Sequence, residues 1–187
     1  MTEFVRRDLG IGLLPTSGLV LGQTDLLRRF LELASSYSCG TFFLAAPFFD
    51  SAFVETLLGY LLPEKTAFEL IVKDRQSACD LYDLFGQRRS RGVSIRIADR
   101  LHAKVFIFES AKFDLLGVVG SHNATAAAIS QNLEAGAFIG GRLGSREWRH
   151  LFDLRNSLRA SSTSYVGEIT AGSPRRESDD EYDHSFN

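Results

Sequence analysis

Cysteine is nearly absent from this sequence, and its scarcity excludes two classes of protein. The 187 residues contain two cysteines, Cys39 and Cys79, which are too few for a disulfide framework. They do not form a Cys-x-x-Cys pair, so the sequence does not indicate a structural zinc site. With 44% hydrophobic and 24% charged residues, the composition is that of a folded globular protein rather than a disordered chain.

Long hydrophobic runs are lacking as well. The most apolar stretch near the N-terminus, residues 9–22, is interrupted by Pro15, Thr16 and Ser17. It is too short and too broken for a membrane span, and the acidic residues that precede it argue against a signal peptide. We therefore expect a cytoplasmic protein without a membrane partner.

An excess of basic charge, the usual mark of a nucleic-acid-binding protein, is also missing, because the formal net charge is −2. The negative sign has a local origin. Residues 160–187 carry six acidic and two basic side chains, which leaves 19 basic and 17 acidic ones before them. We interpret residues 1–160 as one folded domain. Residues 161–187 are interpreted as a flexible acidic tail, a candidate for binding a further protein.

Hydrophobic periodicity and breaker residues predict alternating strands and helices. Helices are expected at 25–35, 50–62, 77–85, 125–130 and 145–159. Strands are expected at 41–46, 67–72, 93–98, 102–108, 115–119 and 133–139. This order predicts an α/β fold, with a mixed sheet flanked by helices on both faces. The core is expected to contain Phe42, Phe43, Phe48, Phe49, Phe106 and Phe108.

The most informative pattern lies in residues 101–136. His102 and Lys104 are two residues apart on a predicted strand, so their side chains are expected on the same face. The imidazole can act as nucleophile or base, and the ammonium group can bind an anion.

A second group of polar residues follows the next predicted strand. Gly120 lets the chain turn tightly, and Ser121 and Asn123 then offer a hydroxyl and an amide where a helix is expected to begin. Together with an ammonium group and helix N–H groups, these are donors, and donors converging on one point suit a phosphate.

A carboxylate near His102 could hold its second ring nitrogen and fix the tautomer. Glu134 is the favoured partner. Glu109 would point to the opposite face of a regular strand from His102, so it is expected to hold the scaffold. His122, between the two polar site residues, is expected to have no chemical role.

These residues resemble the HKD motif of the phospholipase D superfamily: His102-x-Lys104, the acid Glu109, and Gly120-Ser121-x-Asn123. The stretch 132–136 is similar to the one after this motif in nuclease-like members, and residues 47–50 resemble the first loop of the domain. In layout the resemblance covers about residues 24–158.

The sequence departs from the family pattern in two ways. The motif's aspartate is Glu109 here, and the gap from it to Gly120 is longer than usual. We expect an extended hairpin around residues 110–114 to absorb the extra length at the surface.

The resemblance implies a phospholipase D-like catalytic domain that needs no metal or other cofactor. In the family two HKD motifs meet at one site, where one histidine attacks phosphorus and the other protonates the leaving oxygen. This chain has one His-x-Lys, which implies a homodimer with two copies of His102 across a two-fold axis. Short single-motif members are typically nucleases, so an endonuclease is expected. The implied catalytic residues are His102, Lys104, Ser121, Asn123 and Glu134.

Arginine accounts for 17 of the 21 basic residues, and its planar fork suits phosphate oxygens. Arg96, Arg100 and Asn132 are the expected substrate-binding residues, with DNA favoured over RNA. A second arginine cluster at 142–159 is either part of the same groove or a solvated helix face. Few aromatic residues lie among these arginines, so no platform for base stacking is expected.

Two other functions stay open. One is a phospholipase or phosphatidyl transferase of the same superfamily, which would need an apolar membrane-facing surface. The other is a non-catalytic module that binds nucleic acid or a partner. A role in defence against phage fits a small nuclease by analogy with the family.

Overall fold

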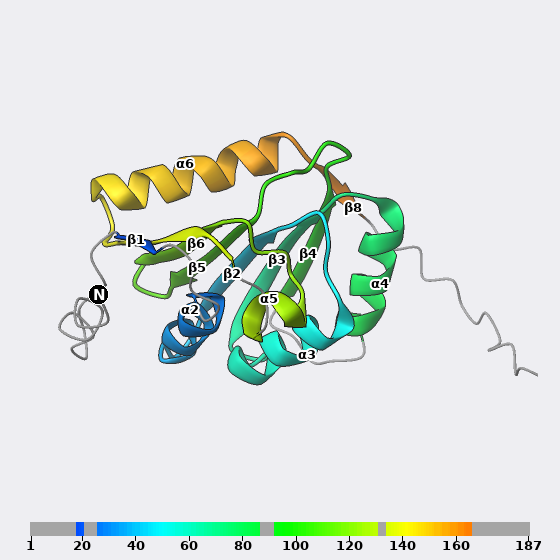
Figure 1. Cartoon of the computed structure of the whole chain (residues 1–187), viewed down its shortest axis with the longest axis horizontal. Coiled ribbons are helices and arrows are strands. Elements are labelled where there is room, and N and C mark those ends of the chain that lie inside the picture. The colour runs from blue at the N-terminus through cyan, green and yellow to red at the C-terminus, as the bar shows by residue number, and fades with distance from the viewer. Residues whose placement is uncertain (1–17, 21–25, 87–91, 131–133, 166–187) are drawn as a thin grey trace, which may run out of the picture.

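The computed structural model describes residues 18–20, 26–86, 92–130 and 134–165. Within these residues a single mixed sheet of eight strands has the order β1-β7-β6-β5-β2-β3-β4-β8. Helices lie on both faces of the sheet (Figure 1), which confirms the predicted α/β architecture. None of the helices in these ranges is long and apolar enough to cross a membrane.

Strands and helices alternate along most of the described chain. The strands are β1 (Gly18–Val20), β2 (Gly40–Ala45), β3 (Thr66–Val72), β4 (Gly92–Ile97), β5 (Val105–Ser110), β6 (Leu115–Gly120), β7 (Gly136–Gly141) and β8 (Thr163–Tyr165). The helices are α2 (Leu26–Ser35), α3 (Ser51–Tyr60), α4 (Arg75–Gly86), α5 (Ala126–Ser130) and α6 (Arg146–Ala160). All five helices agree with the prediction to within two residues.

The directions of the strands bring several strand ends to one edge of the sheet. Strands β2, β3 and β4 are parallel, whereas β5, β6 and β7 follow β2 in antiparallel order. The carboxyl ends of β2, β3, β4 and β6 therefore meet the amino ends of β5 and β7. We call this edge the motif edge; it is marked by Ala45, Val72, Ile97, Gly120, Val105 and Gly136.

Two hydrophobic layers sandwich the sheet, because successive strand residues point to opposite faces. Phe42 on β2 belongs to the layer under α2, α3, α4 and α5, together with Phe30, Phe53, Phe68 and Phe106. Its neighbour Phe43 belongs to the layer under α6, with Ile71, Ile107 and Leu151. Burying each of these large side chains stabilises the fold by about 1.5–3 kcal/mol, which holds the strands of the motif edge in register.

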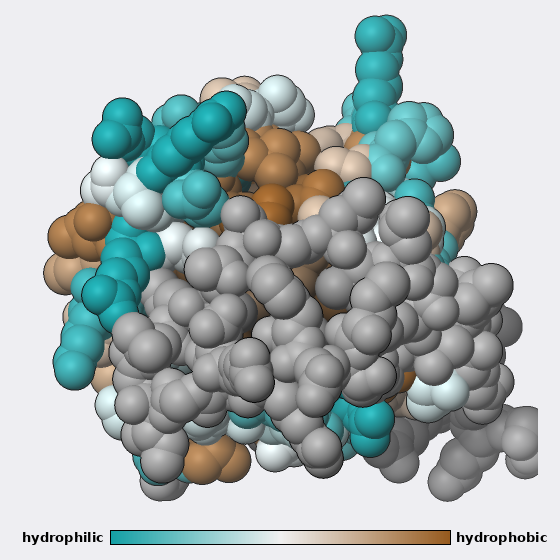
Figure 2. Space-filling view, turned by 60° about the vertical axis from the view of Figure 1, so that its left-hand side comes forward, coloured by the Kyte–Doolittle hydropathy of each residue, from teal (hydrophilic) through white to brown (hydrophobic). Residues whose placement is uncertain are grey.

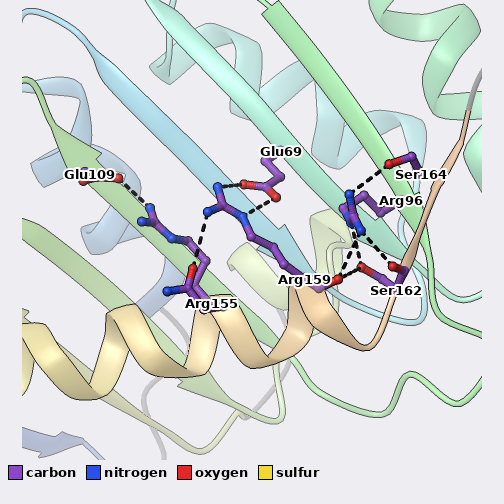
Figure 3. Close-up of polar contacts among 8 residues, drawn as sticks. Glu69, Arg96, Glu109, Arg155, Arg159, Ser162 and Ser164 are labelled. Carbon is purple, nitrogen blue, oxygen red and sulfur yellow. Dashed lines mark hydrogen bonds and ion pairs between the residues drawn. The ribbon is translucent and has the colours of Figure 1, made fainter.

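Ion pairs join α6 to the sheet beneath it. The Arg155 Nη1 atom lies 2.5 Å from Glu109 Oε2 on β5, and Arg159 binds both carboxylate oxygens of Glu69 on β3 (Figure 3). At the top of the molecule, the side that α6 covers, hydrophobic residues show between hydrophilic ones (Figure 2). These two arginines thus pair with glutamates of the sheet; the Arg155 side chain is buried, whereas that of Arg159 stays 38% exposed.

The structure places three boundaries differently from the sequence pattern. Strand β5 begins at Val105, not at residue 102, because its partner β2 ends at Ala45 just before Pro47, and the pairing ends with it. Strand β7 begins at Gly136 rather than 133. The sheet also continues past residue 160, since β8 pairs with β4; residues 166–187 of the expected tail lie outside the described residues.

Phe48 is not the core residue that its sequence neighbourhood suggests. Its side chain is 59% exposed, whereas Phe42, Phe43, Phe106 and Phe108 are buried and Phe49 is partly buried against the core. The sequence pattern fails at this position because residues 47–50 form a loop beyond the end of β2, where no helix lies over the Phe48 ring.

Candidate active site

The two halves of the motif meet at the motif edge. The Gly120 N–H donates a hydrogen bond to the Lys104 carbonyl oxygen at 3.2 Å, which joins the His-x-Lys segment directly to the Gly-Ser segment. This contact extends the antiparallel pairing of β5 and β6, whose last paired residues are Val105 and Val119. Residues 16 positions apart in sequence thereby become neighbours.

His102 and Lys104 precede β5 and are not part of it. The His102 side chain is exposed, and within the described residues its ring has no hydrogen-bond partner. Lys104 is partly buried, and its Nζ atom donates to the His102 carbonyl oxygen at 3.3 Å. An imidazole open to solvent and an ammonium group thus lie together at the surface.

Ser121 connects the end of β6 to the residue pair before β7. Its hydroxyl donates to a carboxylate oxygen of Glu134 and accepts from the Ala135 N–H at 3.0 Å. The Ser121 N–H also donates to the Ala135 carbonyl oxygen at 2.9 Å. Glu134 therefore contacts Ser121, and the pairing of Glu134 with His102 stays a prediction.

The end of β6 lies so close to the Ala135–Gly136 backbone that position 120 requires glycine. A Cβ atom at Gly120 would lie 2.3 Å from the Ala135 carbonyl oxygen and 2.6 Å from the Gly136 Cα atom. Both are backbone atoms that cannot rotate away, so any side chain here would push β6 and β7 apart.

His122 occupies a position that its place in the sequence does not reveal. Its side chain is fully buried, and neither ring nitrogen has a hydrogen-bond partner among the described residues. Burial lowers the pKa of His122, and the nearby charge of Glu134 opposes this shift in part. The ring is therefore neutral near pH 7 and fills space beside Gly136, where an added Cβ would lie 3.0 Å from His122 Cε1. The spacing to Lys104 sets His102 apart in the sequence, but no sequence signal indicates that His122 is buried.

Asn123 is partly buried, and the loop after β2 holds its neighbour in place. The Ala124 N–H donates to the Phe48 carbonyl oxygen, and the Asp50 N–H donates to the Ala124 carbonyl oxygen, both at 3.0 Å. The Asp50 carboxylate caps α3 through the Phe53 N–H at 2.6 Å and also accepts from the α5 backbone at Ala126. Asp50 is predictable as a helix cap, but its role in fixing the Asn123 loop comes from tertiary contacts.

The remaining predicted site residues have different positions. Arg100 is exposed two residues before His102. Arg96 donates to Ser162 and Ser164 and to two carbonyl oxygens at the end of α6 (Figure 3). Because these bonds hold β8 to β4, we leave Arg96 out of the proposed substrate-binding residues. Asn132 lies outside the described residues.

Glu109 holds the scaffold, as its side-chain direction predicts. It pairs with Arg155 of α6 at the end of β5 far from the motif edge. The predicted hairpin after it is present: the Ser110 N–H donates to the Asp114 carbonyl oxygen at 2.9 Å, and the turn contains Phe113 with a φ of 65°.

Comparisons with known proteins give a consistent result for the fold. No protein-family model and no curated protein matches the sequence. Among solved structures, Nuc from Salmonella typhimurium, a phospholipase D family member, matches over 81% of this chain and 99% of its own, with 13% identity and a TM-score of 0.55. The chain has a phospholipase D-like fold. NucT from Helicobacter pylori matches over 74% of this chain and 90% of its own, with 12% identity and a TM-score of 0.50.

A third similar structure belongs to a longer protein. TrmBL2, described as an archaeal chromatin protein with a novel mode of DNA binding, is 11% identical, with a TM-score of 0.51. The match covers 88% of this chain and 58% of TrmBL2. The phospholipase D-like fold of the present chain thus occurs both in proteins of similar size and as part of a larger one.

On this phospholipase D-like fold, the motif edge carries a histidine and several hydrogen-bond donors within one surface region. His102 offers a ring nitrogen to solvent, while Lys104 and Arg100 supply positive charge. The Ser121–Glu134 contact and the Asp50 bonds hold the surrounding backbone rigid. The arrangement is suited to binding a tetrahedral anion and attacking it with a histidine nitrogen.

Proposed function

We propose that this chain is a metal-independent phosphodiesterase that cleaves nucleic acid. The observation that carries the proposal is the hydrogen bond from Gly120 to Lys104, because it unites His102-x-Lys104 with Gly120-Ser121-x-Asn123 at one edge of a phospholipase D-like fold. Separately, each of these short motifs is a weak signal. Together, at one edge of the sheet, they form a specific pattern.

In the proposed first step, a neutral His102 nitrogen attacks the phosphorus of a phosphodiester. A nitrogen–phosphorus bond forms, and the bond from phosphorus to the leaving oxygen breaks. Lys104 and Asn123 would bind the non-bridging oxygens and stabilise the negative charge that develops on them. The leaving oxygen takes a proton from a second imidazole, which must start as imidazolium.

The second step restores the enzyme. The second imidazole, now neutral, removes a proton from water, and the water oxygen attacks the phosphohistidine. The nitrogen–phosphorus bond breaks, so His102 is released neutral and the second imidazole again carries its proton. Reactants and products balance as one water consumed for each phosphodiester cleaved.

This mechanism requires two imidazoles at one site, and we propose that the second comes from another copy of the chain. His122 cannot supply it, since its ring is buried and faces the protein interior. A symmetric homodimer that joins two motif edges would bring both copies of His102 to one phosphate. It would also double the positive charge around the shared groove.

The test is cleavage of single-stranded DNA, double-stranded DNA and RNA in excess EDTA. We expect wild-type protein to cleave DNA and His102→Ala to be inactive. His150→Ala removes an exposed histidine on α6 and should retain wild-type activity. A folded wild-type protein that leaves all three substrates intact would contradict the proposal, and turnover of phospholipid vesicles instead would favour the lipase alternative.

The dimer can be tested separately by mixing subunits. Heterodimers of wild-type and His102→Ala chains contain one imidazole per shared site, so a random mixture should lose more activity than dilution explains. Activity that falls in simple proportion to the wild-type fraction would show that each chain works alone.

A further inference from the structure

A large aromatic side chain is exposed at the motif edge without a role in folding. Phe48 is 59% exposed. The other large hydrophobic residues exposed in the described chain lie elsewhere: Leu62, Phe113 and Leu143 at the opposite edge of the sheet, and Tyr82 on α4. At this exposure the Phe48 ring gains little of the stabilisation that burial gives, so its side chain is open to contact with a ligand.

The backbone that carries Phe48 is fixed relative to the candidate active site. Pro47 restricts the chain before it, and the Phe48 carbonyl oxygen accepts the Ala124 N–H at 3.0 Å. Phe49 and Ala124 form a parallel bridge. The Asp50 N–H donates to the Ala124 carbonyl oxygen, and the Asp50 carboxylate accepts from the Ala126 N–H. The phenyl ring is thus presented from a rigid support and not from a loose loop.

Phe48 is also close to the phosphate-binding donors. Bridged backbones lie about 5 Å apart. The Phe48 backbone therefore lies about one strand spacing from Asn123, one of the residues proposed to bind the phosphate. The surroundings are polar, since His102, Arg100 and Ser121 are all exposed on this edge.

This environment favours a nucleobase over a protein partner. Stable protein interfaces bury about 800 Å² per partner around an apolar centre. The motif edge offers one isolated phenyl ring, with Arg100, His102 and Ser121 exposed on the same edge, and no second large exposed hydrophobic residue lies there among the described residues. An aromatic face beside cations is instead the combination that binds single-stranded nucleic acid.

We propose that Phe48 is a base-stacking subsite, which receives the base of the nucleotide next to the cleaved phosphate. This rests on the proposed function and narrows its substrate to nucleic acid with an unpaired base, because a base inside a duplex has no free face for the ring. It also replaces the expectation that the domain lacks a stacking platform.

The experiment measures the affinity of a fluorescein-labelled single-stranded 12-mer DNA in EDTA, with His102→Ala present in every protein to stop cleavage. Adding Phe48→Ala should weaken binding about tenfold or more, and Phe48→Trp should preserve it. The matched control is Phe113→Ala, which removes an equally exposed ring (57%) at the opposite edge and should leave affinity unchanged. Duplex DNA should show less than a threefold effect of Phe48→Ala.

Two results would overturn the subsite. One is equal affinity of the Phe48→Ala and Phe113→Ala proteins for the single strand. The other is dissociation of a homodimer in Phe48→Ala, measured by light scattering, which would make Phe48 an interface residue. Either can occur while wild-type protein still cleaves DNA in EDTA, so failure of the subsite is distinguishable from failure of the proposed function.

Discussion

Replacing Glu109 by glutamine separates the structural role of the motif's acid from its chemistry. Glu109 accepts from Arg155 Nη1 at 2.5 Å, and the Arg155 side chain is 5% exposed. The Arg155 Nε atom is already buried without a hydrogen-bond partner among the described residues. Glu109→Gln keeps the shape of the side chain but removes its negative charge. The positive charge of the buried Arg155 guanidinium would then be stabilised mainly by the Phe152 ring, whose centre lies 5.2 Å from Arg155 Cζ.

The expected cost follows from the burial of the pair. Removing one partner of a buried ion pair typically costs about 3–5 kcal/mol, because the other charge is left uncompensated. Glu109 retains 18% exposure, so water can reach the pair in part, and we expect a value near the lower limit, about 3 kcal/mol. For a chain of this length that corresponds to a decrease in Tm of roughly 6–12 °C.

Urea unfolding at pH 7 measures this loss, and the protein's single tryptophan, Trp148 on α6, provides the fluorescence signal. The double variant Glu109→Leu/Arg155→Met should recover most of the stability, since it removes both charges. DNA cleavage by Glu109→Gln at 20 °C should stay within twofold of wild type, because Glu109 is about 13 Å along β5 from Val105. A loss of stability below about 1 kcal/mol, or a Glu109→Gln protein that is stable but inactive, would contradict this structural role of Glu109.

Three further changes test how the site is built. Gly120→Ala should lower Tm and abolish cleavage together, since its Cβ would lie 2.3 Å from a backbone oxygen, whereas Gly86→Ala, with nothing within 4 Å, should do neither. Burial lowers the pKa of His122 below its ordinary 6.5, so the unfolded chain binds a proton first as pH falls. The contribution of His122 to the free energy of unfolding should be fully present above pH 6.5. Below pH 6.5 it should decrease by up to about 1.4 kcal/mol per pH unit. His122→Phe should remove this part of the decrease when urea unfolding is measured between about pH 7.5 and 5. Asp50→Ala should lower Tm more than Asp74→Ala. The Asp50 carboxylate caps α3 and also binds α5, whereas the Asp74 carboxylate accepts from the Ser77 N–H in the first turn of α4. Equal decreases in Tm would contradict this expectation.

Much of the fold could be predicted because its signals are local. Breakers such as Pro47 and caps such as Asp50 and Ser145 mark the helix and strand ends, and those ends agree closely with the structure. Strands β1 and β8 were not predictable in this way. Each has three residues and exists through pairing with a distant strand, and β8 depends on side-chain bonds from Arg96.

Some features of the candidate site were likewise predictable from the sequence, and others were not. The types and spacing of His102, Lys104 and Asn123 are properties of the sequence, and residue type and spacing alone indicate phosphate chemistry. The contact made by Glu134 is different, because Ser121 and Glu134 are 13 residues apart and meet through the pairing of β6 with β7.

Residue type and short spacing were enough to predict which chemical groups this protein carries and the order of most of its strands and helices. Which of these residues water can reach depended on the tertiary structure. In the sequence Phe48 and Phe49 are both expected in the core and nothing indicates that His122 is buried, yet Phe48 is exposed and His122 is buried. Exposure depends on which residues from elsewhere in the chain pack above a side chain. It distinguishes the buried, space-filling His122 from His102, the proposed nucleophile. It also distinguishes Phe49, which packs against the core, from Phe48, the proposed base-stacking subsite.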